Sequence, residues 1–248
     1  SPDMPPTLAL TTQAVGPFRG LITNGLWWRA LRLQDEGNYF EAIQLADWIS
    51  SLQPRLTRVW TWQSWNMAYN ISVEFEDRRQ RYDWIMNGLR LLRDDGLRFN
   101  PRDPTISRQI AQTIRDKIGN DAEHRRYYQY RWVLTMQRYL DQGDRAELEA
   151  IAGAPATRAE LLADTGVGAL AEQARAAGLD VFEQPPSTLN ADDRAQLPAA
   201  ARELLASAAH RPALARLKRY HQRRRLWAEQ RLDVDRMLAV DRKYGPLD

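Results

Sequence analysis

The sequence of 248 residues contains no cysteine, which excludes disulfides, thiol nucleophiles and cysteine-based metal sites. It has only three histidines, His124, His210 and His221, and their spacing matches no metal-binding motif such as H-E-x-x-H. A G-x-S-x-G motif, a phosphate-binding glycine loop placed after a strand and an EF-hand pattern are also absent. We therefore expect no enzyme activity, no cofactor and no bound metal.

Long apolar runs and a strong charge imbalance are missing as well. No apolar stretch approaches the roughly 20 residues that are needed to cross a bilayer. The net charge is only +3, so the overall field does not call for a nucleic-acid partner. Alternation of apolar and polar residues is rare, whereas apolar residues often recur three and four positions apart. These patterns predict an all-α protein.

The composition changes along the chain and predicts three parts. Residues 1–16 contain three prolines and no helical period, so we expect an extended N-terminal arm. Residues 17–143 are expected to be helical and contain eight of the nine tryptophans. Residues 144–248 are rich in alanine, leucine and arginine, and we expect a helical region that is either a cap or a second subdomain.

Two helix starts are expected in the C-terminal region. One helix should begin at Asn190 or just after it and run to about Ala208. The next should begin at Pro212, because proline is favoured in the first turn of a helix.

The stretch "GNYFEAIQLADWISSLQP", residues 37–54, begins with glycine and ends with proline around an amphipathic segment. If Pro54 closes a helix–turn–helix unit of 34 residues, the unit begins at Thr23. The two helices would then pack through large and small residues in turn: Leu26, Ala30 and Leu33 on the first, and Ala42, Ala46 and Ile49 on the second. We expect the alanines to let the two helices approach closely.

Two further units follow with the same kind of spacing. "WQSWNMAYN", residues 62–70, would form the first helix of a second unit, whose second helix is displaced by an insertion of about ten residues. A third unit would start near Pro104. Its inner residues and those of the next helix are expected to meet: Ile110, Ala111 and Ile114 on one side, and Tyr127 and Tyr130 on the other.

This arrangement resembles the tetratricopeptide (TPR) repeat, most closely in the first unit. Glu123 stands where that family has alanine, so the third unit departs from the pattern. The resemblance implies a right-handed array of helix pairs, a TPR-like α-solenoid, that acts as a non-catalytic scaffold for a protein or peptide. More narrowly, the chain resembles uncharacterised bacterial TPR-like proteins in which this region follows a membrane-spanning segment. That resemblance implies the soluble part of a membrane-anchored protein, on a side of the membrane that it does not specify.

In the TPR family, ligand-contacting residues lie on the first helix of each unit and face the concave side. The resemblance assigns the following positions to this groove: Asn24, Trp27, Gln34, Trp60, Gln63, Asn70, Arg108, Gln112 and Arg115. The alternative is that most of the tryptophans fill the space between helices. Because adjacent helical residues point about 100° apart, Trp27 and Trp28 cannot both be buried in one seam.

A second candidate site is the basic segment "RPALARLKRYHQRRR", Arg211 to Arg225. The alternative function for the chain is binding of nucleic acid or anionic lipid through this helix. The residues that would contact phosphates are Arg216, Lys218, Arg219, Arg223 and Arg224. A structural explanation is that these cations pair with acids elsewhere, such as Asp233 and Asp235. No nucleic-acid motif surrounds the segment, so nucleic acid is the less expected partner.

Overall fold

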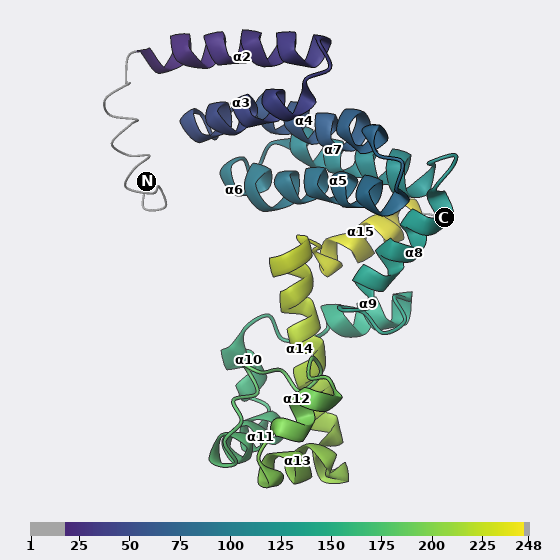
Figure 1. Ribbon diagram of the computed structural model, residues 1–248. Helices are drawn as coiled ribbons and strands as arrows, with labels where there is room; N and C mark the ends of the chain where they lie inside the picture. The colour runs from purple at the N-terminus through teal and green to yellow at the C-terminus, as the bar shows by residue number, and fades with distance from the viewer. Residues whose placement is uncertain (1–17, 246–248) are drawn as a thin grey trace. The chain divides into compact units, whose positions relative to one another are not determined.

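The computed structural model describes residues 18–245, so the predicted arm at residues 1–16 lies outside the described range. Helices and turns make up that range and no strand occurs in it, which confirms the all-α class (Figure 1). None of the helices between residues 18 and 245 is long and apolar enough to cross a bilayer. The chain divides into two compact units, one ending at Trp132 and the other beginning at Val133.

The first unit is built from successive helices. Its α-helices are α2 (Arg19–Asp35), α3 (Tyr39–Leu52), α4 (Thr57–Trp65), α5 (Arg78–Arg90), α6 (Leu97–Phe99), α7 (Pro104–Thr113) and most of α8 (Arg125–Met136). Tighter or wider helical turns extend three of them: η2 (Asn66–Asn70) and η3 (Ile71–Glu74) after α4, η4 (Leu91–Gly96) after α5, and η5 (Ile114–Gly119) after α7.

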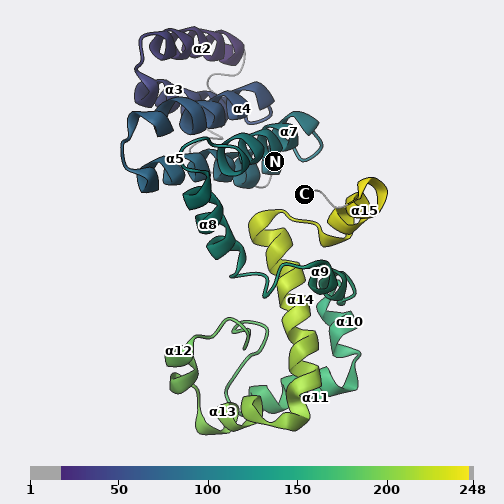
Figure 2. The same ribbon diagram turned by 90° about the vertical axis from the view of Figure 1, so that its right-hand side faces the viewer.

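Helices α2 and α3 form an antiparallel hairpin, and both ribbon views draw them side by side (Figures 1 and 2). The turn depends on Gly37, whose φ of +78° lies in the left-handed region that glycine adopts without strain. The Asn38 amide donates to the Leu33 carbonyl at 2.8 Å, and the Gly37 amide donates to the Gln34 carbonyl at 3.0 Å. This pair of bonds is the Schellman motif that ends many helices. The predicted turn at Gly37 is therefore confirmed.

The seam between α2 and α3 is closed by small side chains. Ala30, Ala42 and Ala46 are completely buried, and Leu33 and Ile49 are buried beside them. An alanine at a helix contact lets the two backbones approach closely, which increases the dispersion contacts along the seam. The alternation of large and small residues that the sequence predicted for this hairpin is confirmed.

A still closer approach occurs between α4 and α5. A Cβ atom added at Gly88 of α5 would lie 2.8 Å from the carbonyl oxygen of Ser64 on α4. Only glycine fits at this crossing without a shift of the backbone. Between α4 and α5 the chain continues through η2 and η3 into a turn, where the Asp77 side chain accepts from the Arg79 amide as the N-cap of α5.

The third pair is formed by α7 with η5 and α8. Asp103 caps α7 by accepting from the Thr105 amide, and Pro104 occupies the first turn as predicted. Tyr128 is buried against α5, whereas Tyr130 is 61% exposed and Ala111 is also exposed. The predicted inner positions at Ala111 and Tyr130 are therefore wrong, because α8 turns Tyr128 and Tyr127 toward the core instead.

The second unit is organised around α14. Its helices are α9 (Arg145–Ala152), α10 (Arg158–Leu162), α11 (Thr165–Ala176), α12 (Ala191–Gln196), α13 (Ala199–Ala206), α14 (Arg211–Gln230) and α15 (Val234–Tyr244), with a 3₁₀ turn at η6 (Ala208–His210). Leu217 and Tyr220 of α14 belong to a core that includes Leu161 and Leu170, and Leu226 belongs to a second core. Figure 2 shows α14 as the longest helix of this unit, and α9, α10 and α11 pack against it.

Two boundaries differ from the sequence-based expectation. The single helix expected from Asn190 to about Ala208 is two helices, because Pro198 has no amide hydrogen and interrupts the helical bonding between α12 and α13. The division between the two units falls within α8, ahead of the compositional change after Gly143. Tyr139 explains this position, because it packs with Ile151 and Leu226 of the second unit.

The glycine at the α4–α5 crossing gives a direct test of the packing. We expect Gly88→Ala to lower the free energy of unfolding by about 1–3 kcal/mol, because the new methyl group overlaps the Ser64 carbonyl. Gly25→Ala, a matched change inside α2 where an added Cβ meets no atom within 4 Å, should raise it by about 1 kcal/mol. Denaturant titration followed by tryptophan fluorescence reports on this unit, because eight of the nine tryptophans lie there. Equal effects of the two variants would contradict the close crossing.

Candidate functional site

Two of the predicted groove residues lie inside the first unit. Trp60 is 6% exposed, stacks on Phe99 with ring centroids 6.0 Å apart, and donates its indole N–H to the Pro54 carbonyl at 2.8 Å. Gln63 is completely buried, and its amide donates to the Asp47 carboxylate at 2.5 Å. The expectation that Trp60 and Gln63 contact a partner is corrected, because both side chains are covered by neighbouring segments of the same unit.

The adjacent tryptophans of α2 point in different directions, as helix geometry requires. Trp27 lies edge-on against Trp62 at 5.3 Å, and the guanidinium of Arg58 lies 5.6 Å from its ring centroid. Trp28 is 74% exposed. The prediction that the two rings do not share one seam is confirmed. The sequence had assigned the groove contact to Trp27, which is half-buried against α4.

The other predicted groove residues are divided between partly buried and exposed positions. Gln34 is partly buried, and its side-chain oxygen accepts no hydrogen bond from the described residues. The Asn70 amide donates to the Asn66 side chain at 2.7 Å, and a partner would have to replace this hydrogen bond. Asn24 is exposed on α2, and three exposed residues lie on α7 and η5: Arg108, Gln112 and Arg115. Arg115 binds Asp116 at 2.9 Å and, with a smaller contribution from Gln112, lowers the pKa of that carboxyl.

The outer side of α2 carries large apolar side chains that no described residue covers. Their exposed fractions are 62% for Phe18, 69% for Leu21, 42% for Ile22 and 74% for Trp28. At about 100° per residue, Leu21 and Trp28 lie about 180° and 160° around the helix from Ala30, whereas Phe18 and Ile22 lie about 120° and 80° from it, so the four side chains form a band along one side of α2. We call Phe18, Leu21, Ile22 and Trp28 the outer stripe of α2.

The outer stripe was not predicted, although the sequence contains a signal for it. A helix at the surface of a globular protein is normally apolar on one side only. The segment from residue 18 to residue 33 is apolar on two sides, because Leu26, Ala30 and Leu33 form the inner side and the outer stripe forms the other. Such a helix is covered on both faces in its functional state or presents one face to a partner.

The basic helix α14 uses its cations inside the second unit. Their partners are carboxylates, backbone carbonyls and a tyrosine hydroxyl. Arg216 pairs with Asp164, Lys218 with Asp141 at 2.5 Å, Arg219 with Glu147 at 3.0 Å and Arg223 with Asp235 at 2.5 Å. Arg223 also donates to the Ala152 carbonyl at 2.9 Å, and Arg224 donates to the Tyr220 hydroxyl at 3.2 Å. The expected pairing with Asp235 is confirmed, whereas Asp233 instead caps α15. The predicted anion-binding surface is therefore largely occupied by contacts of the same unit.

Glu147 is the centre of this network. Its buried carboxylate accepts from three consecutive backbone amides, those of residues 141–143, at 2.8–3.0 Å. It also accepts from Gln222 and Arg219 of α14, each at 3.0 Å. Burial by itself would raise the pKa of Glu147, but these hydrogen bonds to the charged form outweigh it and lower the pKa to about 2. The ionised carboxylate thus fastens the loop before α9 to α14.

This arrangement predicts an acid-sensitive second unit. The pKa of Glu147 is lower in the folded protein than in the unfolded chain, where it is roughly 4.3. The ionised carboxylate therefore stabilises the fold fully above roughly pH 4.3, and this stabilisation is lost as the pH falls toward about 2. We expect Glu147→Gln to lower the free energy of unfolding by roughly 2–3 kcal/mol at pH 7, and by progressively less as the pH falls through this window. Urea titrations from pH 7 to pH 2.5, followed by the amide signals of residues 141–143, measure the difference. Glu149→Gln is the matched control, because Glu149 lies on the same helix two residues after Glu147 and is exposed. A difference that stays constant with pH would argue against the ionised anchor.

His221 shows no catalytic arrangement. Its ring is buried beside Phe182 and Tyr220, and its Nε2 lies 3.1 Å from the Val181 carbonyl. Burial lowers its pKa, which favours the neutral ring. Across residues 18–245, no group of three or more acidic or histidine side chains is placed to hold a metal ion.

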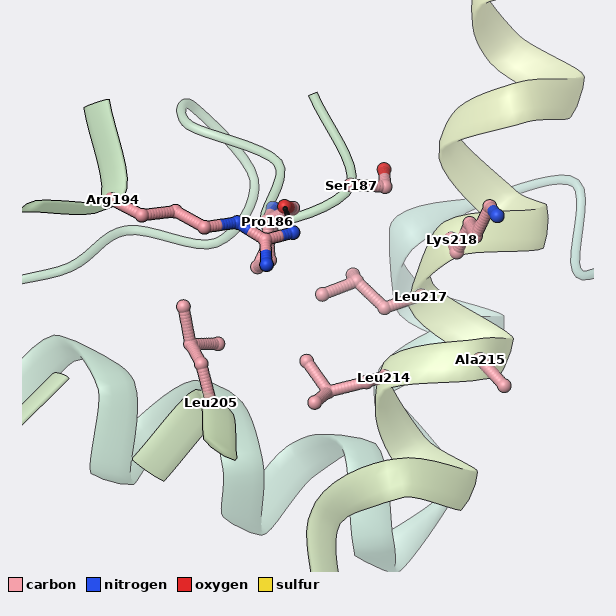
Figure 3. Close-up of a pocket in the computed structure, with 8 residues that line it drawn as sticks. All are labelled: Pro186, Ser187, Arg194, Leu205, Leu214, Ala215, Leu217 and Lys218. Carbon is pink, nitrogen blue, oxygen red and sulfur yellow. Dashed lines mark hydrogen bonds between the residues drawn. The ribbon is translucent and has the colours of Figure 1, made fainter. Parts of the chain in front are cut away.

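The second unit also contains a hollow of about 210 Å³ (Figure 3). It lies between α13, α14 and the segment from residue 186 to α12, and its lining residues are Pro186, Ser187, Arg194, Leu205, Leu214, Ala215, Leu217 and Lys218. Figure 3 shows Leu205 pointing into the hollow from α13 and Leu214 and Leu217 from α14. The Arg194 guanidinium lies at its edge and donates to the Pro186 carbonyl at 3.1 Å. No sequence motif indicated this hollow.

Comparison with known proteins gives no match to a family model, to a curated protein or to a solved structure.

Proposed function

We propose that the first unit is a non-catalytic scaffold, a TPR-like array of helix pairs, that binds an amphipathic helix of a partner protein on the outer stripe of α2. The observation that carries the proposal is the exposure of four large apolar side chains on one side of one helix. The binding surface is then the outer side of the first helix pair. It replaces the inner groove that the repeat resemblance implied, because Trp60 and Gln63 are buried there.

Exposure of the outer stripe to water has a free-energy cost. Burial of a large apolar side chain is worth roughly 1.5–3 kcal/mol, and aromatic residues dominate the binding energy of many interfaces. A helix array needs a polar outer face on its terminal element to remain soluble alone. Within the described residues α2 is the first helix, and its outer face is apolar from Phe18 to Trp28. A partner that covers this face removes the cost.

The length of the stripe favours a helical partner. It extends over about three helical turns from Phe18 to Trp28, and a Cβ atom added at Gly25 within it would meet no atom within 4 Å, so this surface is open. An amphipathic partner helix presents apolar side chains at i, i+3, i+4 and i+7 over the same length. The neighbouring cations Arg29 and Arg32 already pair with Glu41 and Glu36 at 2.8 and 2.9 Å. The contact is therefore mainly apolar.

The alternative function, binding of nucleic acid or anionic lipid through Arg211–Arg225, has less support. Counterion release requires cations that are free to contact phosphates. Arg219 and Arg223 are held by Glu147, Asp235 and backbone carbonyls, and a phosphate would have to displace these contacts. We therefore keep the protein or peptide scaffold as the conclusion. The resemblance described above would place it near a membrane through a segment that precedes this region.

The proposal is tested with charged substitutions on the outer stripe. A partner identified by in-cell crosslinking at position 24 or 25 is titrated against the purified chain. We expect Leu21→Asp and Trp28→Asp to weaken binding by more than about tenfold, since each removes roughly 1.5 kcal/mol or more of apolar contact. Trp227→Asp is the matched control, because Trp227 is an exposed tryptophan of the second unit and should leave affinity unchanged. Circular dichroism confirms that each variant is folded.

The outcome that contradicts the proposal is equal affinity of the wild type, L21D and W28D for every crosslinked partner. Two further results would show that the stripe binds something other than a helix of another protein. A dimer in light scattering that L21D converts to a monomer would identify a second copy of the chain as the occupant. Sedimentation with neutral vesicles that W28D abolishes would identify a lipid surface.

A further inference from the structure

The structure points to a second binding site, in the hollow of the second unit. We propose that this hollow binds the carboxylate of a small amphipathic acid, with Arg194 holding the carboxylate and the leucines of α13 and α14 holding an apolar group of about six carbons. The site is separate from the outer stripe of α2 and does not depend on the scaffold function.

The apolar part of the hollow sets the size of the ligand. Leu205, Leu214 and Leu217 point into it from two helices (Figure 3). An apolar cavity of about 150 Å³ is large enough to bind benzene. The volume of about 210 Å³ therefore accommodates a six-carbon chain or ring, and it is smaller than the pockets that take drug-sized molecules, which start at about 300 Å³.

Arg194 supplies the charge. Its guanidinium has five N–H donors, and the contact that the structure records for it is the one to the Pro186 carbonyl at 3.1 Å. Among the residues that the structure describes, no carboxylate forms an ion pair with it. The neighbouring Asp193 is engaged with the backbone of Asn190 in a capping box. A guanidinium binds a carboxylate in a bidentate way, through two parallel N–H···O hydrogen bonds.

Lys218 plays a different part. It also lines the hollow, but its ammonium group binds Asp141 at 2.5 Å, so its charge is already balanced. The uncompensated charge at the hollow is therefore that of Arg194. An acid fits this combination of one free cation and three leucines, whereas an amine would be repelled and an alcohol would leave the guanidinium without an anion.

Two sources could supply such a ligand: a free short-chain acid, or the C-terminal carboxylate of a peptide that ends in leucine. Both present one carboxylate attached to a compact apolar group. The experiment uses hexanoate and acetyl-glycyl-leucine as probes, each titrated into the uniformly ¹⁵N-labelled full chain and followed by amide chemical shifts. Hexanol and the amide of acetyl-glycyl-leucine are the controls that lack the carboxylate.

We expect saturable shifts in α12, α13 and α14 with one or both acids, and at least about tenfold weaker binding of the matching control. Arg194→Gln should weaken acid binding by about tenfold, whereas Arg202→Gln, an exposed arginine of α13 that does not line the hollow, should not change it. Leu205→Gln should weaken both acids and alcohol, since Leu205 is only partly buried and contributes to the apolar floor. The spectrum of each variant shows whether it is folded.

Binding of only one acid identifies the source and supports the proposal. The proposal is overturned if neither acid gives saturable shifts in these helices. It is also overturned if hexanol binds as tightly as hexanoate, or if folded R194Q binds both acids as the wild type does.

Discussion

The first unit depends on residues that have almost no side chain at the helix crossings. Ala30, Ala42 and Ala46 let α2 lie along α3, and Gly88 lets α5 touch the backbone of α4 at Ser64. These contacts fix the rotation of each helix about its own axis, because the small residues must face the neighbour. For α2, the rotation that turns Ala30 inward turns Leu21 and Trp28 of the outer stripe outward. The exposed apolar surface, and with it the scaffold function that we propose, is a consequence of the packing on the other side of the same helix.

The second unit is held together by a different principle. Here a strongly basic helix, α14, is central, and its cations are balanced by acids and carbonyls from segments far away in the sequence. Glu147 is the most buried member of this network, and its ionised carboxylate joins a loop of three backbone amides to α14. Breaking such a pair leaves a buried charge without a partner, which is costly. The basic run therefore serves the fold, whereas Arg194 lies outside α14, beside the hollow, and forms no ion pair with a described residue.

The turn and the seam of the α2–α3 hairpin could be predicted from the sequence, because each has a strong stereochemical cause. A left-handed glycine ends α2, and alanines at helical spacing form the seam. Burial of Trp60 was not predictable from its own helix, because Phe99 and the Pro54 carbonyl, which cover and bind its ring, come from segments on either side of α4. Pro198 is the sequence signal for the break between α12 and α13, because a proline inside a helical segment ends the helix before it. No short sequence motif could predict the hollow, because its lining residues Arg194, Leu205 and Leu217 lie on three different helices.

The most direct test of the account compares the solvent exposure of Trp28 and Trp60. The chain is labelled with 5-fluorotryptophan, each ¹⁹F signal is assigned with a Trp→Phe variant, and a soluble paramagnetic agent is added. The account predicts that the signal of Trp28 broadens most and that of Trp60 hardly at all, with Trp27 between them. Broadening of Trp60 as strong as that of Trp28 would mean that the inner face is open to solvent, and it would contradict the assignment of the binding surface to the outer side of α2.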